Sequence, residues 1–314
     1  MVVLCTIIML GVLLFSFNRR SRDSLLAADT LMNSTQALNC AEAGLNIAMA
    51  ALKRSDALRA SGKMTDFLTG EKEIPLNDGT CLVTVCEESG KLNLNLLKTS
   101  EGTLDRTRID QVLRLIDLLN RSDLQAGPIG YGLVPAIIDW TDGDEETTSL
   151  AFVAHDNRGA ESDYYTGLDQ PYRAKNAPLD TIEELLLIRA VTPDVFDRIR
   201  DYVTVKGDGK ININSASQLV IESLSEQMNS ALAQMIVTRR REKPFGNLTE
   251  LRDMPGMTTA VYQAIRQTAT VRTEDKYYQV TSRGSAAGSA RTIVALIQRK
   301  TDANKLEIIQ YKEL

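Results

Sequence analysis

The amino-acid sequence predicts an α+β fold, with a long N-terminal helix, an antiparallel sheet and a large α-helical domain inserted in that sheet. One observation is that residues 1–60 contain no proline and place apolar residues at helical spacing. The other is that strand-like segments stand on both sides of a helical block of about 170 residues. Because strands from both ends could share one sheet, we expect four parts: residues 1–59, 60–97, 98–272 and 273–314.

The first segment of the chain is apolar and predicts a membrane anchor. Met1–Phe17 carries no charge and would span about 25 Å as a helix, slightly less than a hydrocarbon core of about 30 Å. No basic residue precedes this segment and no small-x-small site follows it, so we expect a retained single-pass transmembrane helix and not a cleaved signal peptide. The apolar residues expected to line this helix include Leu4, Ile7, Ile8, Leu10, Leu13 and Leu14.

An amphipathic stalk follows the apolar segment. Residues 19–22 contain three arginines, and apolar residues then recur at i, i+3, i+4 and i+7 from Leu25 to Leu52. The stalk is predicted to end at Arg59. Counted alone, the arginines would place the globular part in the cytoplasm.

Two strands are expected after a loop at 61–69. Turn residues introduce alternating patterns at 81–86 and at 91–96. Cys81 and Cys86 are five residues apart in one strand, so they face opposite sides and should not bridge each other within it.

The central block is predicted to be a series of helices joined by turns. Apolar residues recur at helical spacing, and capping residues or proline stand at several predicted starts. A short apolar segment at 131–140 and a strand at 210–214 interrupt the series. Helices are expected at 105–120, 179–190, 193–203, 215–224, 229–241, 248–254 and 258–269, and the closing strands at 277–282, 290–300 and 305–311.

Composition argues against several classes of function. The net charge of −5 gives no general electrostatic attraction for nucleic acid or an anionic membrane surface. A single histidine and a single tryptophan leave little for histidine-based catalysis or for a sugar-binding cleft. No common catalytic, nucleotide-binding or zinc-binding motif occurs at the spacing it needs, so we do not expect an enzyme.

An acidic loop is the main candidate for chemistry. Residues 139–165 hold eight acidic side chains and one arginine. Carboxylates crowded in this way repel one another unless a hard cation neutralises them, and oxygen ligands suit calcium. The spacing is not that of an EF-hand, and a solvated acidic loop is the alternative. The acidic residues are Asp139, Asp142, Asp144, Glu145, Glu146, Asp156, Glu161 and Asp163.

A second candidate is the turn Met254–Met257, which fits a helix-hairpin-helix. Such hairpins offer backbone N–H groups to phosphates, and the basic residues Arg239, Arg240, Arg241 and Lys243 lie nearby. A membrane-tethered DNA-binding protein is therefore an alternative function. The acidic balance favours the simpler interpretation, in which the hairpin only packs two helices.

Several motifs in one order resemble the K-type minor pseudopilin of bacterial type II secretion systems. The resemblance covers almost the whole chain, from the apolar helix and stalk onwards. The matching motifs are GKLNLN at 90–95, DWTDGD at 139–144, ESDYY at 161–165, NAPL at 176–179 before EEL at 183–185, and ININSA at 211–216.

This resemblance implies a pilin-like fold and a non-enzymatic subunit at the tip of a periplasmic pseudopilus. The subunit would assemble with I- and J-type minor pseudopilins through its N-terminal helix and globular contacts. It would sit in the inner membrane by a single pass, with the globular domain in the periplasm, and no nucleic acid partner is expected. The resemblance also implies bound calcium, with Asp142, Asp144, Glu161 and Asp163 as ligands and Asp139 as a further candidate.

Two departures from the family pattern stand at the N-terminus. Family members carry a short basic leader ending in glycine, and none precedes Met1. We therefore expect either that the start of the sequence is placed too late or that the sequence begins at or near the mature end. Cys5 stands where ordinary pilins have glutamate, which is typical of the K-type. A minor pilin of a type IV pilus remains an alternative with the same architecture.

Overall fold

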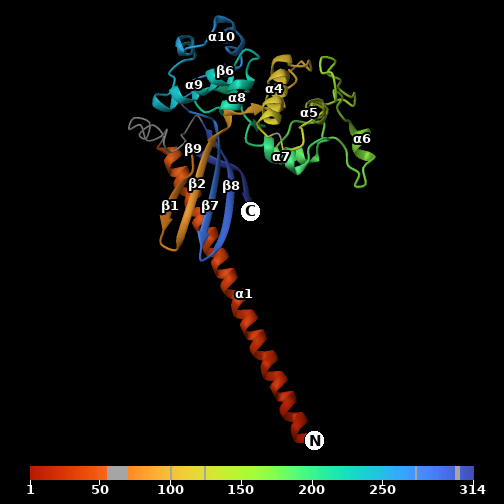
Figure 1. Ribbon diagram of the computed structural model, residues 1–314, viewed down its shortest axis with the longest axis vertical. Helices are drawn as coiled ribbons and strands as arrows, with labels where there is room; N and C mark the ends of the chain where they lie inside the picture. The colour runs from red at the N-terminus through yellow and green to blue at the C-terminus, as the bar shows by residue number, and fades with distance from the viewer. Residues whose placement is uncertain (55–69, 100, 124, 273, 301–304) are drawn as a thin grey trace. The chain divides into compact units, whose positions relative to one another are not determined.

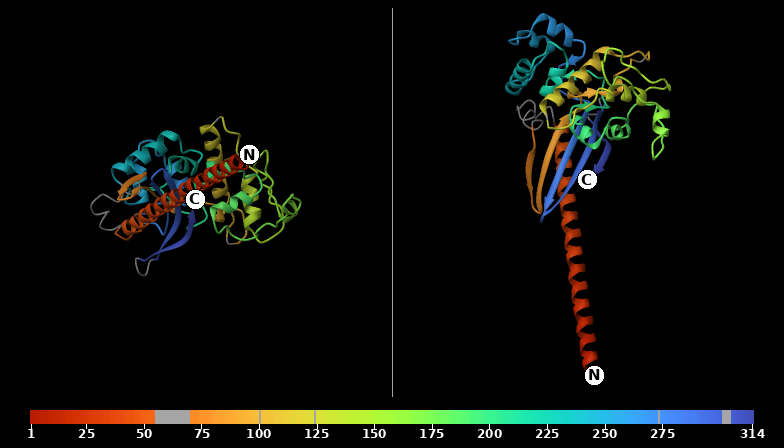
Figure 2. Two further views of the ribbon diagram at one scale, coloured as in Figure 1. Left: turned by 90° about the horizontal axis from the view of Figure 1, so that it is seen from below. Right: turned by 45° about the vertical axis from the view of Figure 1, so that its right-hand side comes forward.

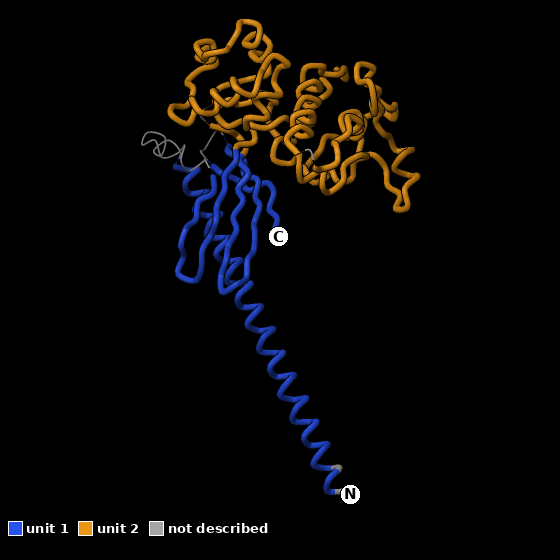
Figure 3. Tube along the Cα trace, viewed as in Figure 1, with its two compact units in different colours: residues 1–86, 278–314 blue, residues 87–277 orange. Residues whose placement is uncertain are grey.

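The computed structural model of the protein describes residues 1–54, 70–99, 101–123, 125–272, 274–300 and 305–314. The loop expected at 61–69 and the expected end of the stalk at Arg59 lie outside the described residues. The chain forms two compact units, one of residues 1–86 with 278–314 and one of residues 87–277 (Figure 3). Residues 87–97, which the sequence assigned to the sheet, therefore belong to the second unit.

The first unit is built on one helix, α1 (Val2–Lys53), of 52 residues. Only its C-terminal part lies along the sheet (Figure 1). From Ala37 onwards one face of α1 is buried, and Leu45 and Leu52 on that face are at most 5% exposed. At the end of the helix the Arg299 guanidinium donates a hydrogen bond of 2.7 Å to the Leu52 carbonyl, which supplies a partner for one of the last carbonyl groups.

The N-terminal part of α1 is uncovered in this chain. The six residues predicted from the apolar segment, Leu4, Ile7, Ile8, Leu10, Leu13 and Leu14, are 56–68% exposed. Four large apolar side chains further along, Leu25, Leu26, Leu31 and Met32, are 56–70% exposed. Among the residues that the structure describes, no helix combines the length and the hydropathy needed to cross a membrane, so the transmembrane helix expected from the sequence is not confirmed.

One five-stranded sheet joins the two ends of the chain. Its order is β1-β2-β7-β8-β9, and the pairs β1–β2 and β8–β9 are antiparallel. The strands lie along the C-terminal part of α1 (Figure 2). The predicted interruption of the sheet by the helical block is confirmed, and the strand at 72–76 is an addition to the prediction. The bounds are β1 (Lys72–Leu76), β2 (Gly79–Glu87), β7 (Tyr277–Ala286), β8 (Ser289–Lys300) and β9 (Lys305–Glu313).

Small residues allow the backbone of β7 to touch the backbone of α1. A Cβ atom on Gly284 would lie far inside van der Waals contact with the Ala37 carbonyl oxygen and the Ala41 nitrogen. Both are backbone atoms of α1, so neither can turn away as a side chain would. Gly44 of α1 in turn faces the Ser282 hydroxyl with no room for a Cβ. Helix and sheet are therefore held at a separation that requires glycine at both of these positions.

The second unit contains two successive copies of one motif. The first copy opens with β3 (Leu92–Asn93), which pairs in parallel with β4 (Val203–Thr204) at its end. The second copy opens with β5 (Ile211–Asn212), which pairs in parallel with β6 (Ala269–Thr270). One continuous apolar core runs through both copies.

Each copy places helices between its two short strands. The first copy, after η1 (Glu88–Gly90), has η2 (Leu94–Leu96), α4 (Arg106–Ser122), α5 (Leu133–Thr141), α6 (Ser162–Thr166), η3 (Ile182–Leu187) and α7 (Pro193–Ile199). The second has α8 (Gln218–Ser223), α9 (Ser230–Glu242), η4 (Leu248–Asp253) and α10 (Thr259–Ile265). Labels with η denote 3₁₀ helices.

The copies share individual polar contacts as well as element order. The Asn95 amide donates to the Leu179 carbonyl at 2.9 Å and accepts from the Leu179 N–H at 2.7 Å. The Asn214 amide makes the same two bonds with Phe245, at 3.0 and 2.9 Å. Each asparagine stands two residues after the asparagine of the opening strand. This polar contact ties the start of each copy to the segment before its 3₁₀ helix.

The turn between the 3₁₀ helix and the last helix has the same geometry in both copies, and we call it the hairpin of each copy. Ala190 and Gly256 both have left-handed backbone, with φ of 70° and 85°. Thr192 and Thr258 follow, and each side chain accepts a bond from a backbone N–H to cap the next helix. The element before each hairpin is a 3₁₀ helix with a capping box, where the sequence predicted an ordinary helix.

The strand predicted at 91–96 is wrong after Asn93, because only Leu92 and Asn93 form a strand. The Asn93 side chain accepts the Asn95 N–H at 3.0 Å, which bends the chain into the 3₁₀ helix η2. The alternation of apolar and polar residues therefore reflects asparagines that bind backbone groups, not one face of a longer strand.

We expect Gly284→Ala to lower the stability of the first unit by about 1–3 kcal/mol, because the new methyl group must push β7 away from the α1 backbone. Thermal unfolding of the full chain in detergent measures the change. Arg283→Ala is the matched control, since Arg283 is the exposed neighbour on the same strand. Equal midpoints for the two variants would contradict the close packing.

Candidate metal centre

Acidic side chains converge at the end of α5 in the first copy. Asp139 lies in the last turn of α5, and Asp142 is the residue that caps its C-terminus. Glu161 directly precedes α6. Because the C-terminal end of a helix carries partial negative charge, it adds to the repulsion among these carboxylates.

Three of the predicted ligands form one group. One carboxylate oxygen each from Asp142, Asp144 and Glu161 lies within 4.8 Å of the other two. Their exposure differs, since Glu161 is 4% exposed while the Asp144 side chain is 54% exposed. The group therefore has a buried side and a side open to solvent.

Several oxygen atoms at this centre are buried without a hydrogen-bond partner among the described residues. They are both carboxylate oxygens of Glu161, Oδ1 of Asp142 and Oδ2 of Asp139. Asp139 is fully buried, and its Oδ1 accepts the Thr148 N–H at 2.9 Å. Burying a carboxylate oxygen without a hydrogen-bond donor costs free energy of folding. Binding a proton or a cation would remove this cost.

The pKa values of these carboxyl groups are raised for the same reason, namely burial close to other negative charges. Burial, together with the charges of Asp139 and Asp142, raises the pKa of Glu161 to about 8. Burial also raises the pKa of Asp139 and of Asp142, although bonds to Thr148 and to Lys98 respectively oppose the rise. Without a cation the centre resists full ionisation near neutral pH.

Two residues that the sequence analysis did not name as ligands, Lys98 and Asn176, lie beside the acidic side chains. Lys98 forms an ion pair with Asp142, and its Nζ lies 3.7 Å from Asp144. The Asn176 amide donates to the Asp144 carbonyl and to the Glu145 carboxylate, both at 3.1 Å. The Oδ1 atom of Asn176 is itself buried without a hydrogen-bond partner among the described residues. Its position in the motif NAPL was the one signal for it in the sequence.

Two predicted ligands lie outside the group of three. Asp139 lies in α5, and its charge helps to raise the pKa of Glu161. Asp163 is exposed in the first turn of α6. The structure thus brings together Asp142, Asp144 and Glu161 from the predicted set.

The residues present fit a hard cation. The donor atoms of the group of three are carboxylate oxygens, with no sulfur or imidazole among them. Calcium takes such ligands in flexible geometry, whereas magnesium demands a near-ideal octahedron. The unpartnered oxygens are those that a cation would satisfy.

Two of the basic residues near the second hairpin, Arg239 and Arg240, make side-chain contacts within the chain. The Arg240 guanidinium donates to the Ile213 carbonyl, and burial lowers its pKa to about 10. Arg239 lies over the Phe245 ring and 3.7 Å from the Glu250 carboxylate. These contacts favour a structural role for this arginine cluster over phosphate binding.

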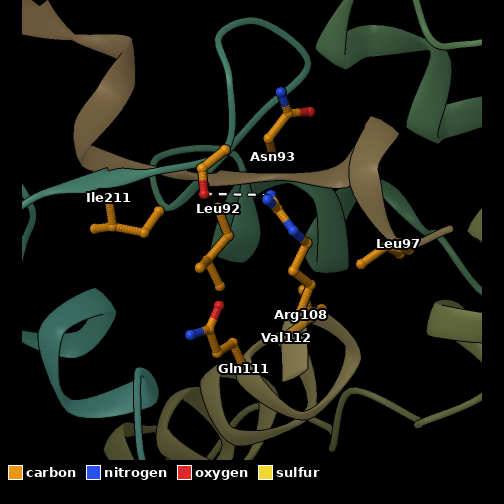
Figure 4. Close-up of a pocket in the computed structure, with 8 residues that line it drawn as sticks. Leu92, Asn93, Leu97, Arg108, Gln111, Val112 and Ile211 are labelled. Carbon is orange, nitrogen blue, oxygen red and sulfur yellow. Dashed lines mark hydrogen bonds between the residues drawn. The ribbon is translucent and has the colours of Figure 1, made fainter. Parts of the chain in front are cut away.

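A cavity in the second unit is too small for an organic ligand. It has a volume of about 10 Å³, which is about one water molecule, and lies between β3 and α4 (Figure 4). Arg108 crosses it to donate a bond of 3.2 Å to the Gly209 carbonyl. The cavity is a packing gap and not a substrate pocket.

Sequence models of one family match both copies of the motif. Two models, both described as "Type II secretion system (T2SS), protein K", match this chain, one over residues 90–208 and the other over residues 211–272, and the matched residues together are more than half of the chain. The chain belongs to the type II secretion system protein K family. The resemblance inferred from the motifs is confirmed, and with it the role of a minor pseudopilin in type II secretion. The two matched parts correspond to the two copies seen in the fold.

Individual members of the protein K family are similar over most of the chain. Type II secretion system protein K of Pseudomonas aeruginosa is 27% identical over 282 residues, which are 85% of this chain and 78% of that protein. The protein of the same name from Klebsiella pneumoniae is 24% identical, over 68% of this chain and 64% of that protein.

A solved structure has the same fold. A chain in the crystal structure of the GspK-GspI-GspJ complex from the enterotoxigenic Escherichia coli type 2 secretion system aligns with a TM-score of 0.66 at 16% identity. The alignment covers 92% of this chain and 99% of that one. The pilin-like fold predicted for a protein K family member is thereby confirmed.

We expect the calcium-free protein to lose stability as the pH rises from 5 to 8. The pKa of Glu161 is about 8 in the folded chain against an ordinary value of 4.5, so the folded state binds the extra proton over this interval and deprotonation costs stability. The thermal midpoint in calcium-free buffer measures the slope. Glu161→Gln should flatten it, whereas Glu146→Gln, an exposed residue of the same loop, should not. An identical slope in wild type and Glu161→Gln would contradict the assignment.

Proposed function

We propose that this chain is a non-enzymatic structural subunit at the tip of the type II secretion pseudopilus. In this role it assembles with I- and J-type minor pseudopilins and supports protein secretion across the outer membrane. Family membership supports the secretion role. The complex named for the structural neighbour, which joins GspK with GspI and GspJ, supports the choice of partners.

The uncovered part of α1 is the observation that carries this proposal. Large apolar side chains from Val3 to Met32 are more than half exposed, and they occur on all sides of the helix. An apolar surface of this length needs cover from lipid or from other helices. Lipid suits the uncharged segment Met1–Phe17, and neighbouring pseudopilin helices suit the stretch from Leu25 to Met32, which carries polar residues as well.

The same helix leads us to propose an inner-membrane location before assembly. Met1–Phe17 would lie in the bilayer as a single pass, with the sheet of the first unit and the whole second unit in the periplasm. Support comes from the absence of charge in this segment and from the exposure of its side chains. The arginines at 19–22 would then lie at the membrane surface.

Replacing Leu25 and Leu26 by serine should weaken co-purification with the I- and J-type subunits about tenfold or more, since buried apolar anchors dominate such interfaces. The thermal midpoint of the double variant should match wild type, because both residues are exposed in the isolated chain. Asp23→Ser, a polar change on the same exposed helix, is the control. Unchanged co-purification of the double variant would contradict the proposed use of α1.

We also propose that the acidic centre binds calcium as a structural ion. Asp142, Asp144 and Glu161 would hold it, with Asn176 as a further oxygen donor. Bound calcium would join the loop after α5 to the start of α6 and remove the repulsion among the carboxylates. The unpartnered buried oxygens of Glu161 and Asp142 support this proposal.

Calcium should therefore raise the thermal midpoint of the full chain relative to chelator-treated protein. At a free concentration of about 100 times Kd the gain is about 2.7 kcal/mol. Glu161→Gln and Asp142→Asn should abolish the gain, because each removes a charged ligand. Asp163→Asn should keep it, although the sequence named Asp163 as a ligand. A wild-type midpoint that does not respond to calcium would refute tight binding.

A further inference from the structure

The candidate metal centre already contains a cation of the chain itself. Lys98 comes from the segment between η2 and α4, outside the acidic loop. Its ammonium group pairs with Asp142, whose side chain is only 8% exposed, and lies 3.7 Å from the more open carboxylate of Asp144. These are two of the three residues that offer oxygens to a metal ion.

A short hairpin fixes the direction from which Lys98 approaches. The Thr99 N–H donates to the Thr103 carbonyl at 2.7 Å, and the Asp105 N–H donates to the Leu97 carbonyl at 2.8 Å. Lys98 itself forms an isolated antiparallel bridge with Leu104. The backbone of Lys98 is therefore held in place, while its four-carbon side chain remains able to move.

The charges at the centre do not balance with Lys98 alone. One ammonium group faces Asp142 and Asp144, while both oxygens of Glu161 and Oδ1 of Asp142 have no hydrogen-bond partner among the described residues. Lys98 thus offsets negative charge at Asp142 and Asp144, whereas the buried Glu161 carboxylate has no positive partner among the described residues. A divalent ion would satisfy both sides but would repel an ammonium group bound to the same two aspartates.

We propose that Lys98 is a built-in counter-ion that occupies the Asp142–Asp144 side of the site without calcium and is displaced when calcium binds. This inference rests on the proposed calcium site. Lys98 lowers the calcium affinity, because the ion must break an existing ion pair to enter. It also stabilises the calcium-free protein, because it neutralises part of the repulsion that would otherwise open the loop.

The test compares calcium titration by calorimetry with thermal unfolding in calcium-free buffer, on the full chain in detergent. Lys98→Met keeps the apolar stem and removes the charge, so the calcium Kd should fall about tenfold while the calcium-free midpoint decreases. Lys98→Arg keeps the charge and should bind calcium with an affinity close to wild type. Should Lys98→Met fail to fold, Lys98→Gln takes its place with the same expectation.

Lys175→Met is a matched control. Lys175 also bridges two carboxylates, those of Asp180 and Glu184 at 2.7 and 2.8 Å, and its side chain is 25% exposed against 23% for Lys98. Its loss should leave the calcium Kd unchanged. A Kd for Lys98→Met that equals or exceeds the wild-type value would overturn the counter-ion role while leaving the calcium site intact. A wild-type chain that gives no calcium heat and no midpoint shift would overturn the calcium site and this inference together.

Discussion

The contact between α1 and β7 is the constraint on which the first unit depends. At Gly284 the strand backbone meets the helix backbone, with Ala37 and Ala41 opposite. This contact joins the start of the chain to its last segment, since β7 follows the whole second unit in sequence. A sheet made of strands from both ends can then enclose one core against the C-terminal part of α1.

The division of labour along α1 follows from that contact. Where small residues meet the sheet, the helix is buried, and before Ala37 large apolar residues are exposed. One continuous helix therefore supplies both the core of a domain and a surface that only other molecules can cover. This arrangement suits a filament subunit, whose helix must leave its own domain to pack among its neighbours.

The second unit carries the acidic centre in the first of its two copies. Both copies keep the parallel strand pair, the asparagine contacts and the left-handed hairpin. In the first copy, the loop after α5 and the start of α6 are added between the early helices and the 3₁₀ helix, and they bring the acidic centre. The contacts shared by the copies hold the motif together, so the first copy can accommodate the added loop and its group of carboxylates.

The sequence by itself determined the long helix, the interrupted sheet and the acidic loop, because helical periodicity, alternation and charge density are local properties of the chain. Only the tertiary structure decided which carboxylates meet. Asp163 follows Glu161 closely in sequence yet is exposed to solvent, whereas Lys98 and Asn176, distant in sequence, reach the centre. Periodicity likewise did not predict the contacts that the two copies share, because the Asn95 side chain binds backbone groups of Leu179, 84 residues away in the sequence. Contacts of this kind depend on how the chain folds back, which no local pattern records.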